Sequence, residues 1–370
     1  MNPFRSFIMG GFECADHINR SGERVNLLRE TGHDERADED FRRLAELGIL
    51  VAREGICWSA VETAPFVFDW TEVRNRLLAA RRHGVQVIWD MCHFGYPADL
   101  YPTHPQFDAR FVALCREFAL FHQTNSTETL LVIPINEMSF LSWHSGDVRG
   151  APPFAIHCGW DLKYHLCRAA IRGLEIIKEL VPSARVMLVE PLVKVHPGPE
   201  ETDHDAVRGM DEAQFQAMDI VTGRMCPELG GREDYLDLPG FNYYYNGQWV
   251  HGGEYLPWPA TEPGRTPLVD LLEGVCQRYG KPVWLSETGH FGDNRALWID
   301  EIADTCREAA RRNIPLRGVC IYPVIDRPDW DDLTSWSNCG LWDMDEQGNR
   351  IAHEESLAAV KRLGEVVSNM

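Results

Sequence analysis

The sequence predicts an α/β protein built as a single (β/α)8 TIM barrel. Short segments rich in branched apolar residues alternate with longer segments of helical periodicity, and eight such strands follow one another along the chain. This alternation indicates parallel strands, and eight of them indicate a closed barrel. A doubly wound open sheet is the alternative, but no Gly-x-Gly-x-x-Gly motif follows a strand. We expect residues 1–370 to form one domain with long loops on its active face.

The expected elements follow from apolar spacing and from the residues that end each segment. Residues 130–136 form an unbroken apolar run, typical of a strand buried on both faces. Phe41, Leu44 and Leu47 have helical spacing, and Gly48 then ends that helix. By the same criteria, strands are predicted over residues 6–14, 49–58, 85–91, 130–136, 184–189, 236–243, 282–286 and 316–321. Helices are predicted over residues 38–47, 71–83, 108–124, 161–180, 211–221, 268–279, 294–312 and 355–367.

Three polar or mixed insertions, residues 16–34, 138–159 and 190–209, are too long to be simple connections. Active sites of barrel enzymes lie at the carboxyl ends of the strands, where such loops gather. We therefore expect these insertions as loops, with residues 16–34 packed over the active face.

Composition excludes several classes of function. The chain carries 36 Lys and Arg against 56 Asp and Glu, a formal charge of −20, so a nucleic-acid partner is not expected. No apolar run is long enough to span a membrane and no signal peptide is recognisable, so the sequence predicts a cytoplasmic protein without a membrane partner. Eleven scattered cysteines without a Cys-x-x-Cys pair are expected to be reduced. Homo-oligomer formation is left open.

Ionisable and aromatic residues follow the predicted strands. Glu137 and Glu287 each come directly after an apolar strand, so both carboxylates are expected at the mouth of the barrel. Two facing carboxyl groups suit glycoside hydrolysis, in which one donates a proton and the other acts as nucleophile or base. The other candidates at the strand ends are Glu13, Asp16, Arg53, Trp58, His93, Asn136, Asn242, Tyr243, Tyr244, Tyr322, Asp326, Asp329 and Trp330.

Several motifs resemble glycoside hydrolase family 1 of clan A, in the order that the family has them. Asn136-Glu137 is similar to the acid/base motif of the clan, and Ser286-Glu287-Thr288-Gly289 to the nucleophile motif Thr-Glu-Asn-Gly. Arg53 and Trp58 match an Arg and a Trp of the family's second strand, and His93 and Pro97 match a His and a Pro after the third. Residues 240–244 match Gly-x-Asn-Tyr-Tyr in the sixth strand. Residues 322–330 match the segment after the eighth strand without gaps, and Gly340, Leu341 and Asp345 are similar to the segment that follows it.

The resemblance implies a retaining β-glycosidase of a β-glucosidase-like type, acting on a small β-glycoside or oligosaccharide. Glu137 would be the acid/base and Glu287 the nucleophile. Arg53, Asn136 and Tyr244 would support these two catalytic residues. The substrate contacts that the resemblance implies are His93, Asn242, Tyr322, Asp329, Trp330 and Glu13. No cofactor and no metal ligand are implied. If the enzyme retains configuration, the two carboxyl groups are expected roughly 5–5.5 Å apart.

The chain departs from the family pattern at four places. Met138 replaces the Pro that follows the acid/base Glu, and Tyr322 replaces a Trp. Asp329 replaces a Glu that contacts sugar hydroxyls, and the first strand lacks the family's Gln, near which Glu13 or Asp16 would stand. These departures motivate a second hypothesis, a non-catalytic carbohydrate-binding barrel. A metal-dependent hydrolase is disfavoured because the fourteen histidines include no His-x-His and no His-Glu-x-x-His.

Overall fold

A closed barrel of eight parallel strands forms the centre of the structure, a computed structural model that describes residues 2–198, 200–259 and 264–370. The strands are ordered β1-β12-β11-β9-β7-β6-β5-β2, and every neighbouring pair is parallel. This confirms the predicted barrel and rules out the doubly wound alternative. Residues 1, 199 and 260–263 fall within the predicted domain, and residue 199 also within the predicted loop 190–209, but they lie outside the described residues. The single domain 1–370 stays a prediction.

The barrel strands are short, and nearly all of their residues are buried, as the branched apolar runs predict. Their bounds are β1 (Ile8–Gly11), β2 (Val51–Gly55), β5 (Gln86–Asp90), β6 (Leu131–Ile133), β7 (Arg185–Pro191), β9 (Leu238–Asn242), β11 (Val283–Thr288) and β12 (Leu316–Ile321). Each strand begins and ends within three residues of its predicted bounds, and the largest differences are at the carboxyl ends of the first, second and fourth predicted strands.

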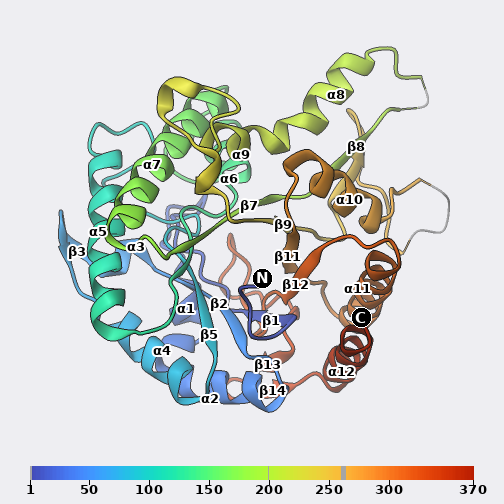
Figure 1. Cartoon of the computed structure of the whole chain (residues 1–370), viewed down its shortest axis with the longest axis horizontal. Helices are drawn as coiled ribbons and strands as arrows, with labels where there is room; N and C mark the ends of the chain where they lie inside the picture. Colours follow the sequence, from blue (N-terminus) through green and yellow to red (C-terminus); the bar gives the residue numbers. More distant parts are fainter. Residues whose placement is uncertain (1, 199, 260–263) are drawn as a thin grey trace.

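Helices surround the barrel (Figure 1). Each presents an apolar stripe to the strands: in α11, for example, Trp298, Ile302 and Cys306 are buried at intervals of one helical turn. The long outer helices are α2 (His33–Glu46), α4 (Thr71–Arg82), α5 (Phe107–Asn125), α7 (Gly159–Leu180), α10 (Leu268–Tyr279), α11 (Asn294–Arg311) and α12 (Glu354–Ser368), with the shorter α9 (Gln216–Val221) after β7.

The three predicted loops contain more regular structure than expected. The insertion 138–159 begins with α6 (Met138–Gly146), which buries Leu141 and packs against α7. The insertion 190–209 contains β8 (Lys194–His196) and most of α8 (His204–Glu212), which project at the upper right of Figure 1, and β8 pairs with β10 (Gln248–Val250). The insertion 16–34 contains α1 (Leu27–Glu30) and the start of α2. Tertiary packing therefore stabilises helices that local spacing did not indicate.

Further short elements lie outside the barrel. The helix predicted over 211–221 is divided between the end of α8, a 3-10 turn at Ala213–Phe215, and α9. Two more 3-10 turns occupy Pro227–Leu229 and Glu233–Tyr235. The remaining elements are α3 (Trp58–Val61) and the antiparallel pairs of β3 (Glu62–Ala64) with β4 (Val67–Phe68) and of β13 (Trp342–Met344) with β14 (Arg350–Ala352).

Apolar side chains fill the interior of the barrel, so the barrel is closed at its base and open at its mouth. Phe4 reaches this interior from the N-terminal segment and packs against Trp284, with ring centroids 5.3 Å apart. The other members are Met9, Val51, Ile88, Leu131, Ile133, Met187, Val189, Leu238, Cys320 and Tyr322. A second, larger core lies between the strands and the surrounding helices. The polar side chains inside the barrel therefore lie at its mouth, on the side of this apolar cluster toward the carboxyl ends of the strands.

No helix in the described ranges 2–198, 200–259 and 264–370 has the length and apolar character needed to cross a membrane. The cytoplasmic location stays a prediction. All eleven cysteines are free, as their scattered spacing predicts.

A buried ionic network ties the start of α2 to the barrel and to the C-terminal hairpin. His33 lies between two carboxylates, with Nδ1 2.9 Å from Asp40 and Nε2 2.9 Å from Glu54. Arg350 of β14 donates to both oxygens of Asp40, and Arg76 of α4 pairs with Glu54 at 3.2 Å. Burial lowers the pKa of His33, but Glu54 and Asp40 outweigh it and the pKa is raised overall.

Replacing this histidine should change how stability depends on pH. Because the folded pKa of His33 is raised, its charge stabilises the fold fully below the unfolded pKa of about 6.5, and the contribution is lost as the pH rises through the folded value. We expect His33→Gln to lower the free energy of unfolding by about 2–4 kcal/mol at pH 6, and by less at pH 9. Urea denaturation of both proteins across this range measures the difference. His83→Gln, at a histidine paired with the exposed Asp38, is the control and should change stability little; a constant deficit for His33→Gln would contradict the ionic account.

Candidate active site

Side chains that point into the barrel alternate along each strand, and this brings polar groups to its mouth. A residue two positions after an interior apolar residue lies on the same face of the strand but nearer the carboxyl end. Four strands show the pattern, with the pairs Val51 and Arg53, Ile88 and Asp90, Trp284 and Ser286, and Cys320 and Tyr322. The mouth therefore lies directly above the apolar interior.

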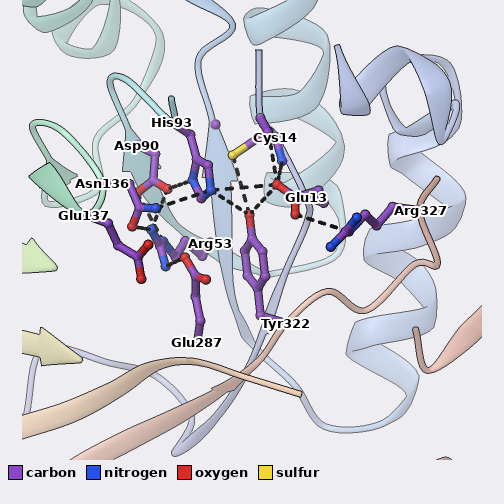
Figure 2. Close-up of polar contacts among 12 residues, drawn as sticks. Glu13, Cys14, Arg53, Asp90, His93, Asn136, Glu137, Glu287, Tyr322 and Arg327 are labelled. Carbon is purple, nitrogen blue, oxygen red and sulfur yellow. Dashed lines mark hydrogen bonds and ion pairs between the residues drawn. The ribbon is translucent and has the colours of Figure 1, made fainter. Parts of the chain in front are cut away.

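Arg53 joins the groups of this mouth. Its guanidinium is fully buried and uses each of its five N–H groups. Two bonds go to Asp90, at 3.2 and 2.8 Å, one goes to Glu287 at 2.6 Å, and the others reach the Ser286 carbonyl and Asn136 Oδ1 at 3.2 and 2.6 Å. Burial would raise the pKa of Asp90, but the charge of Arg53 and the bond from His93 lower it, so the carboxyl is ionised. Arg53 thus links β2, β5 and β11 to the segment after β6 (Figure 2).

These bonds set the orientation of Asn136 and His93. Because Asn136 Oδ1 accepts from Arg53, its Nδ2 faces His93 Nε2, at 3.3 Å. The other ring nitrogen, Nδ1, lies 2.8 Å from Asp90. Nε2 therefore accepts and Nδ1 carries the proton that is donated to Asp90. His93 also stacks on Tyr322, with ring planes 4° apart.

Glu287 and Glu137 occupy different surroundings on opposite sides of the mouth. Glu287 is held by a charge-assisted bond from Arg53 at 2.6 Å and by the Tyr244 hydroxyl, which donates to its other oxygen at 2.7 Å. Glu137 accepts a single side-chain bond, from Asn242 Nδ2 at 2.9 Å. Asn242 is oriented for this by the Ser286 hydroxyl, which donates to its Oδ1 at 2.7 Å.

The two carboxyl groups accordingly differ in their affinity for a proton. Burial, followed by the charge of Glu287, raises the pKa of Glu137 well above its usual range. Burial also raises the pKa of Glu287, and Arg53, His93 and the Tyr244 bond offset part of this rise, so the pKa of Glu287 is raised less than that of Glu137. Since like charges in one buried site do not both ionise easily, the proton shared by the pair resides on Glu137. The arrangement supplies one proton donor and one ionised carboxylate.

A second polar cluster lies beside His93 (Figure 2). Glu13 Oε1 accepts from the backbone N–H groups of Cys14 and Ala15, both at 3.1 Å, and from the Tyr322 hydroxyl at 3.3 Å. Its other oxygen lies 3.7 Å from Arg327 Nε, too far for a hydrogen bond. Neither Oε2 of Glu13 nor the buried Nε of Arg327 therefore has a hydrogen-bond partner among the described residues.

A cavity of about 1250 Å³ opens above these groups. Its floor includes Glu137, Glu287, His93 and Glu13. Its walls are rich in aromatic rings: Phe94, Phe140, Trp143, Trp160, Tyr244, Tyr245, Trp249, Tyr255, Phe291, Tyr322 and Trp330. Cavities of several hundred Å³ bind small molecules, and rings of this kind offer flat apolar faces.

One set of potential metal ligands lies in this mouth. Cys14, Asp90 and His93 place one ligand atom each within 4.8 Å of the others. Both oxygens of Asp90 already accept bonds from Arg53, and burial raises the pKa of the Cys14 thiol well above its usual value. Thiolate is the form that binds metals, so these residues fit the arginine-centred network better than a metal ion.

The structure brings most of the predicted residues together. The cavity lining or the groups directly bonded to it include Glu137, Glu287, Arg53, Asn136, Tyr244, His93, Asn242, Tyr322, Trp330 and Glu13. Asp329 lies elsewhere: its side chain is exposed and accepts from the backbone N–H groups of Asp331 and Asp332, at 2.8 and 3.2 Å. Asp326 bonds the loop backbone, accepting from Cys339 N at 2.9 Å.

Sequence reasoning missed Asp90 and Arg327. Asp90 is the last residue of β5 and lies two residues after the interior Ile88, a parity that marks it as pointing toward the mouth. Arg327 follows the last strand in an irregular segment, where no periodicity indicates the direction of a side chain. Sequence reasoning also assigned no role to Glu190, which acts on the pKa of Glu137, or to Lys163, which faces Glu190.

Comparison with known proteins gives a structural likeness only. No protein-family model matches the chain, and no curated protein matches it. Among solved structures, a family 1 β-glucosidase from Thermotoga maritima is similar with a TM-score of 0.78 and 16% identity, over 100% of this chain and 98% of that one. The β-glucosidase from Thermotoga maritima in complex with glucoimidazole gives 0.77 and 16% over 100% and 99%, and the complex with azafagomine gives 0.77 and 15% over 98% of each chain. The chain therefore has a glycosidase-like fold, and the predicted resemblance is confirmed at the level of structure.

Removing Arg53 should destabilise the fold strongly. In Arg53→Met the buried carboxylates of Asp90 and Glu287 lose their cation, and breaking a buried pair costs about 3–5 kcal/mol. Urea denaturation at neutral pH measures this loss. The deficit should shrink on acidification, because protonation removes the uncompensated charges. Arg5→Met breaks an exposed pair with Glu128 and should cost no more than about 1 kcal/mol; equal losses in the two variants would contradict the central role of Arg53.

Proposed function

We propose that this chain is a retaining β-glycosidase, which hydrolyses a small β-glycoside or oligosaccharide by double displacement. The observation that carries the proposal is the contrast between two buried carboxyl groups at one mouth. Glu137 has a strongly raised pKa, whereas Glu287 is bound by Arg53 and Tyr244. This division suits an acid and a nucleophile. The glycosidase-like fold supports the same reading.

In the first step, an oxygen of Glu287 bonds to the anomeric carbon of the sugar while the glycosidic carbon–oxygen bond breaks. The departing oxygen takes the proton of Glu137, so the aglycone leaves as a neutral alcohol. Arg53 and Tyr244 keep the attacking carboxylate ionised and directed. The product of this step is a glycosyl ester on Glu287.

In the second step, Glu137 is a carboxylate and takes a proton from water as the water oxygen bonds to the anomeric carbon. The ester bond to Glu287 breaks and its carboxylate is restored. Two displacements on opposite faces retain the configuration. Acid, base and nucleophile all come from side chains, so the reaction requires no cofactor.

The sugar itself is expected to contact the groups around this pair. Asn136 would bind the 2-hydroxyl, His93 Nε2 another hydroxyl, and the Trp330 ring a face of the sugar. Asn242 would hold the proton donor in place. Because Asp329 is turned away from the cavity, Glu13 and Arg327 are the groups left to bind the far side of the ring.

Loss of the nucleophile should abolish hydrolysis. We expect wild-type protein to hydrolyse nitrophenyl β-glycosides and Glu287→Gly to lose about 10⁴-fold or more in kcat. Azide should restore turnover and give the glycosyl azide of inverted configuration, because it occupies the space of the lost carboxylate. Glu128→Gly, at an exposed loop residue, is the control.

Wild-type turnover in Glu287→Gly would contradict the assignment of the nucleophile. Sugar binding by calorimetry without turnover of a broad glycoside panel would favour the non-catalytic carbohydrate-binding barrel instead.

Recognition of the sugar should depend on Glu13. Glu13→Gln removes a charged acceptor, and a hydrogen bond to a charged group contributes about 1.5–3 kcal/mol, so kcat/KM should fall about 10–100-fold. Asp329→Asn should change it less than about twofold, since its side chain is exposed and bonds its own loop. Steady-state kinetics on nitrophenyl glycosides of several sugars tests both. A larger loss in Asp329→Asn would restore the sugar contact that the family resemblance implies.

A further inference from the structure

The backbone of Glu137 is held in an unfavourable conformation. Glu137 precedes the first residue of α6 with φ 45° and ψ 59°, in the left-handed region, and its side chain does not cap the helix. A residue with a side chain pays about 1–2 kcal/mol in this region, so the surrounding structure must maintain it. The direction of the Glu137 carboxyl therefore depends on contacts made by its neighbours.

Two consecutive residues of β7 provide these contacts. The Val189 carbonyl accepts from the backbone N–H of Glu137 at 3.0 Å. The Glu190 carboxylate accepts from the backbone N–H of Ser139, in the first turn of α6, also at 3.0 Å. Hydrogen bonds to β7 therefore hold the backbone at Glu137 and at Ser139. The Glu190 carboxylate accepts from an N–H group in the first turn of α6, for which the N-cap side chain provides no acceptor.

Glu190 is a carboxylate in an unusual place for a simple helix cap. It is fully buried at the carboxyl end of β7, near Lys163 and Cys167 of α7. The Met138 N–H also stabilises its charged form. Proline, which the family motif has after the acid/base Glu, has no N–H and could not do so. Met138 at this position therefore keeps an N–H group that lowers the pKa of Glu190.

The charges around the two carboxyl groups come from several elements. The charges of Glu287 on β11 and Glu190 on β7 favour the protonated form of Glu137, while Arg53 on β2 opposes them. Glu190 itself faces the Lys163 ammonium and the Cys167 thiol of α7. Lys163 is held by Gln216 Oε1 at 2.8 Å and the Ala213 carbonyl at 3.3 Å. Burial raises the pKa of Glu190, Ser139 and Lys163 offset part of the rise, and the resulting pKa is about 7, so its charge is present above neutral pH.

We propose that Glu190 is a positioning residue for the acid/base Glu137. Through the Ser139 N–H it fixes the first turn of α6 and so the direction of the Glu137 carboxyl. Its carboxylate also helps to keep the proton on Glu137 until the leaving group takes it. This inference rests on the proposed function, and it predicts a defect confined to the step that needs the acid.

The leaving group separates this role from a structural one. Dinitrophenyl glycosides depart without a proton, whereas phenyl glycosides need the acid. In Glu190→Ala we expect kcat/KM for a phenyl β-glycoside to fall at least about tenfold, and that for the dinitrophenyl β-glycoside to change less than about twofold. An equal loss on both substrates, or none on either, would overturn the proposal.

Glu190→Gln keeps an acceptor for the Ser139 N–H and removes only the charge. The basic limb of the kcat/KM profile, which reports the acid, should therefore move to lower pH by about 0.5 unit or more. Asp237→Asn is the matched control, because Asp237 Oδ2 accepts from the Val186 N–H at the other end of β7, at 2.8 Å. It should leave both the profile and the leaving-group dependence unchanged. An unmoved basic limb in Glu190→Gln would overturn the electrostatic part.

A readout without substrate distinguishes the two proposals. Carbon NMR of glutamate-labelled protein, with Glu137→Gln to identify the signal, gives the titration midpoint of Glu137 in wild type and in Glu190→Gln. A lower midpoint in Glu190→Gln supports the coupling even if no glycoside is hydrolysed, in which case the proposed function alone fails. An unchanged midpoint overturns the coupling whatever the activity.

Discussion

The guanidinium of Arg53 is the constraint on which the rest of the mouth depends. A buried arginine with five donors must find five acceptors, and here they come from two barrel strands, β5 and β11, and from Asn136. Satisfying it requires two buried carboxylates, Asp90 and Glu287, and fixes the amide of Asn136. That amide in turn decides which nitrogen of His93 carries the proton. One cation therefore sets the ionisation or orientation of four neighbours.

The two glutamates at the mouth have the same side chain but differ in proton affinity because their surroundings differ. Glu287 lies against the cation, and its charge is compensated by direct bonds. Glu137 lies away from it, with one neutral donor and with other carboxyl groups nearby. The backbone of Glu137 adopts an unfavourable conformation in the left-handed region, and hydrogen bonds to β7 hold it there. Strain of this kind is tolerated where the surrounding contacts over-determine it.

The end of the cavity near Glu13 is built differently from what the family resemblance implies. Asp329 bonds its own loop, and the polar groups facing the open space are Glu13 and Arg327. The Glu13 carboxylate and the Arg327 guanidinium lie 3.7 Å apart beside the cavity, and aromatic side chains form much of the cavity wall.

The sequence by itself determined the barrel and most of its mouth. Apolar runs and helical spacing are local properties, and the carboxyl ends of parallel strands must converge, so Glu137, Glu287 and Arg53 could be placed together from their positions in or after strands. Only the tertiary structure determined where side chains of irregular segments lie and which residues distant in sequence are in contact. Asp329 lies outside the cavity and Arg327 lines it because no periodicity governs the loop after β12, and α6 is held by Glu190 and packs against α7. The raised pKa of Glu137 likewise arises from burial and from charges on other strands, which no single stretch of sequence contains.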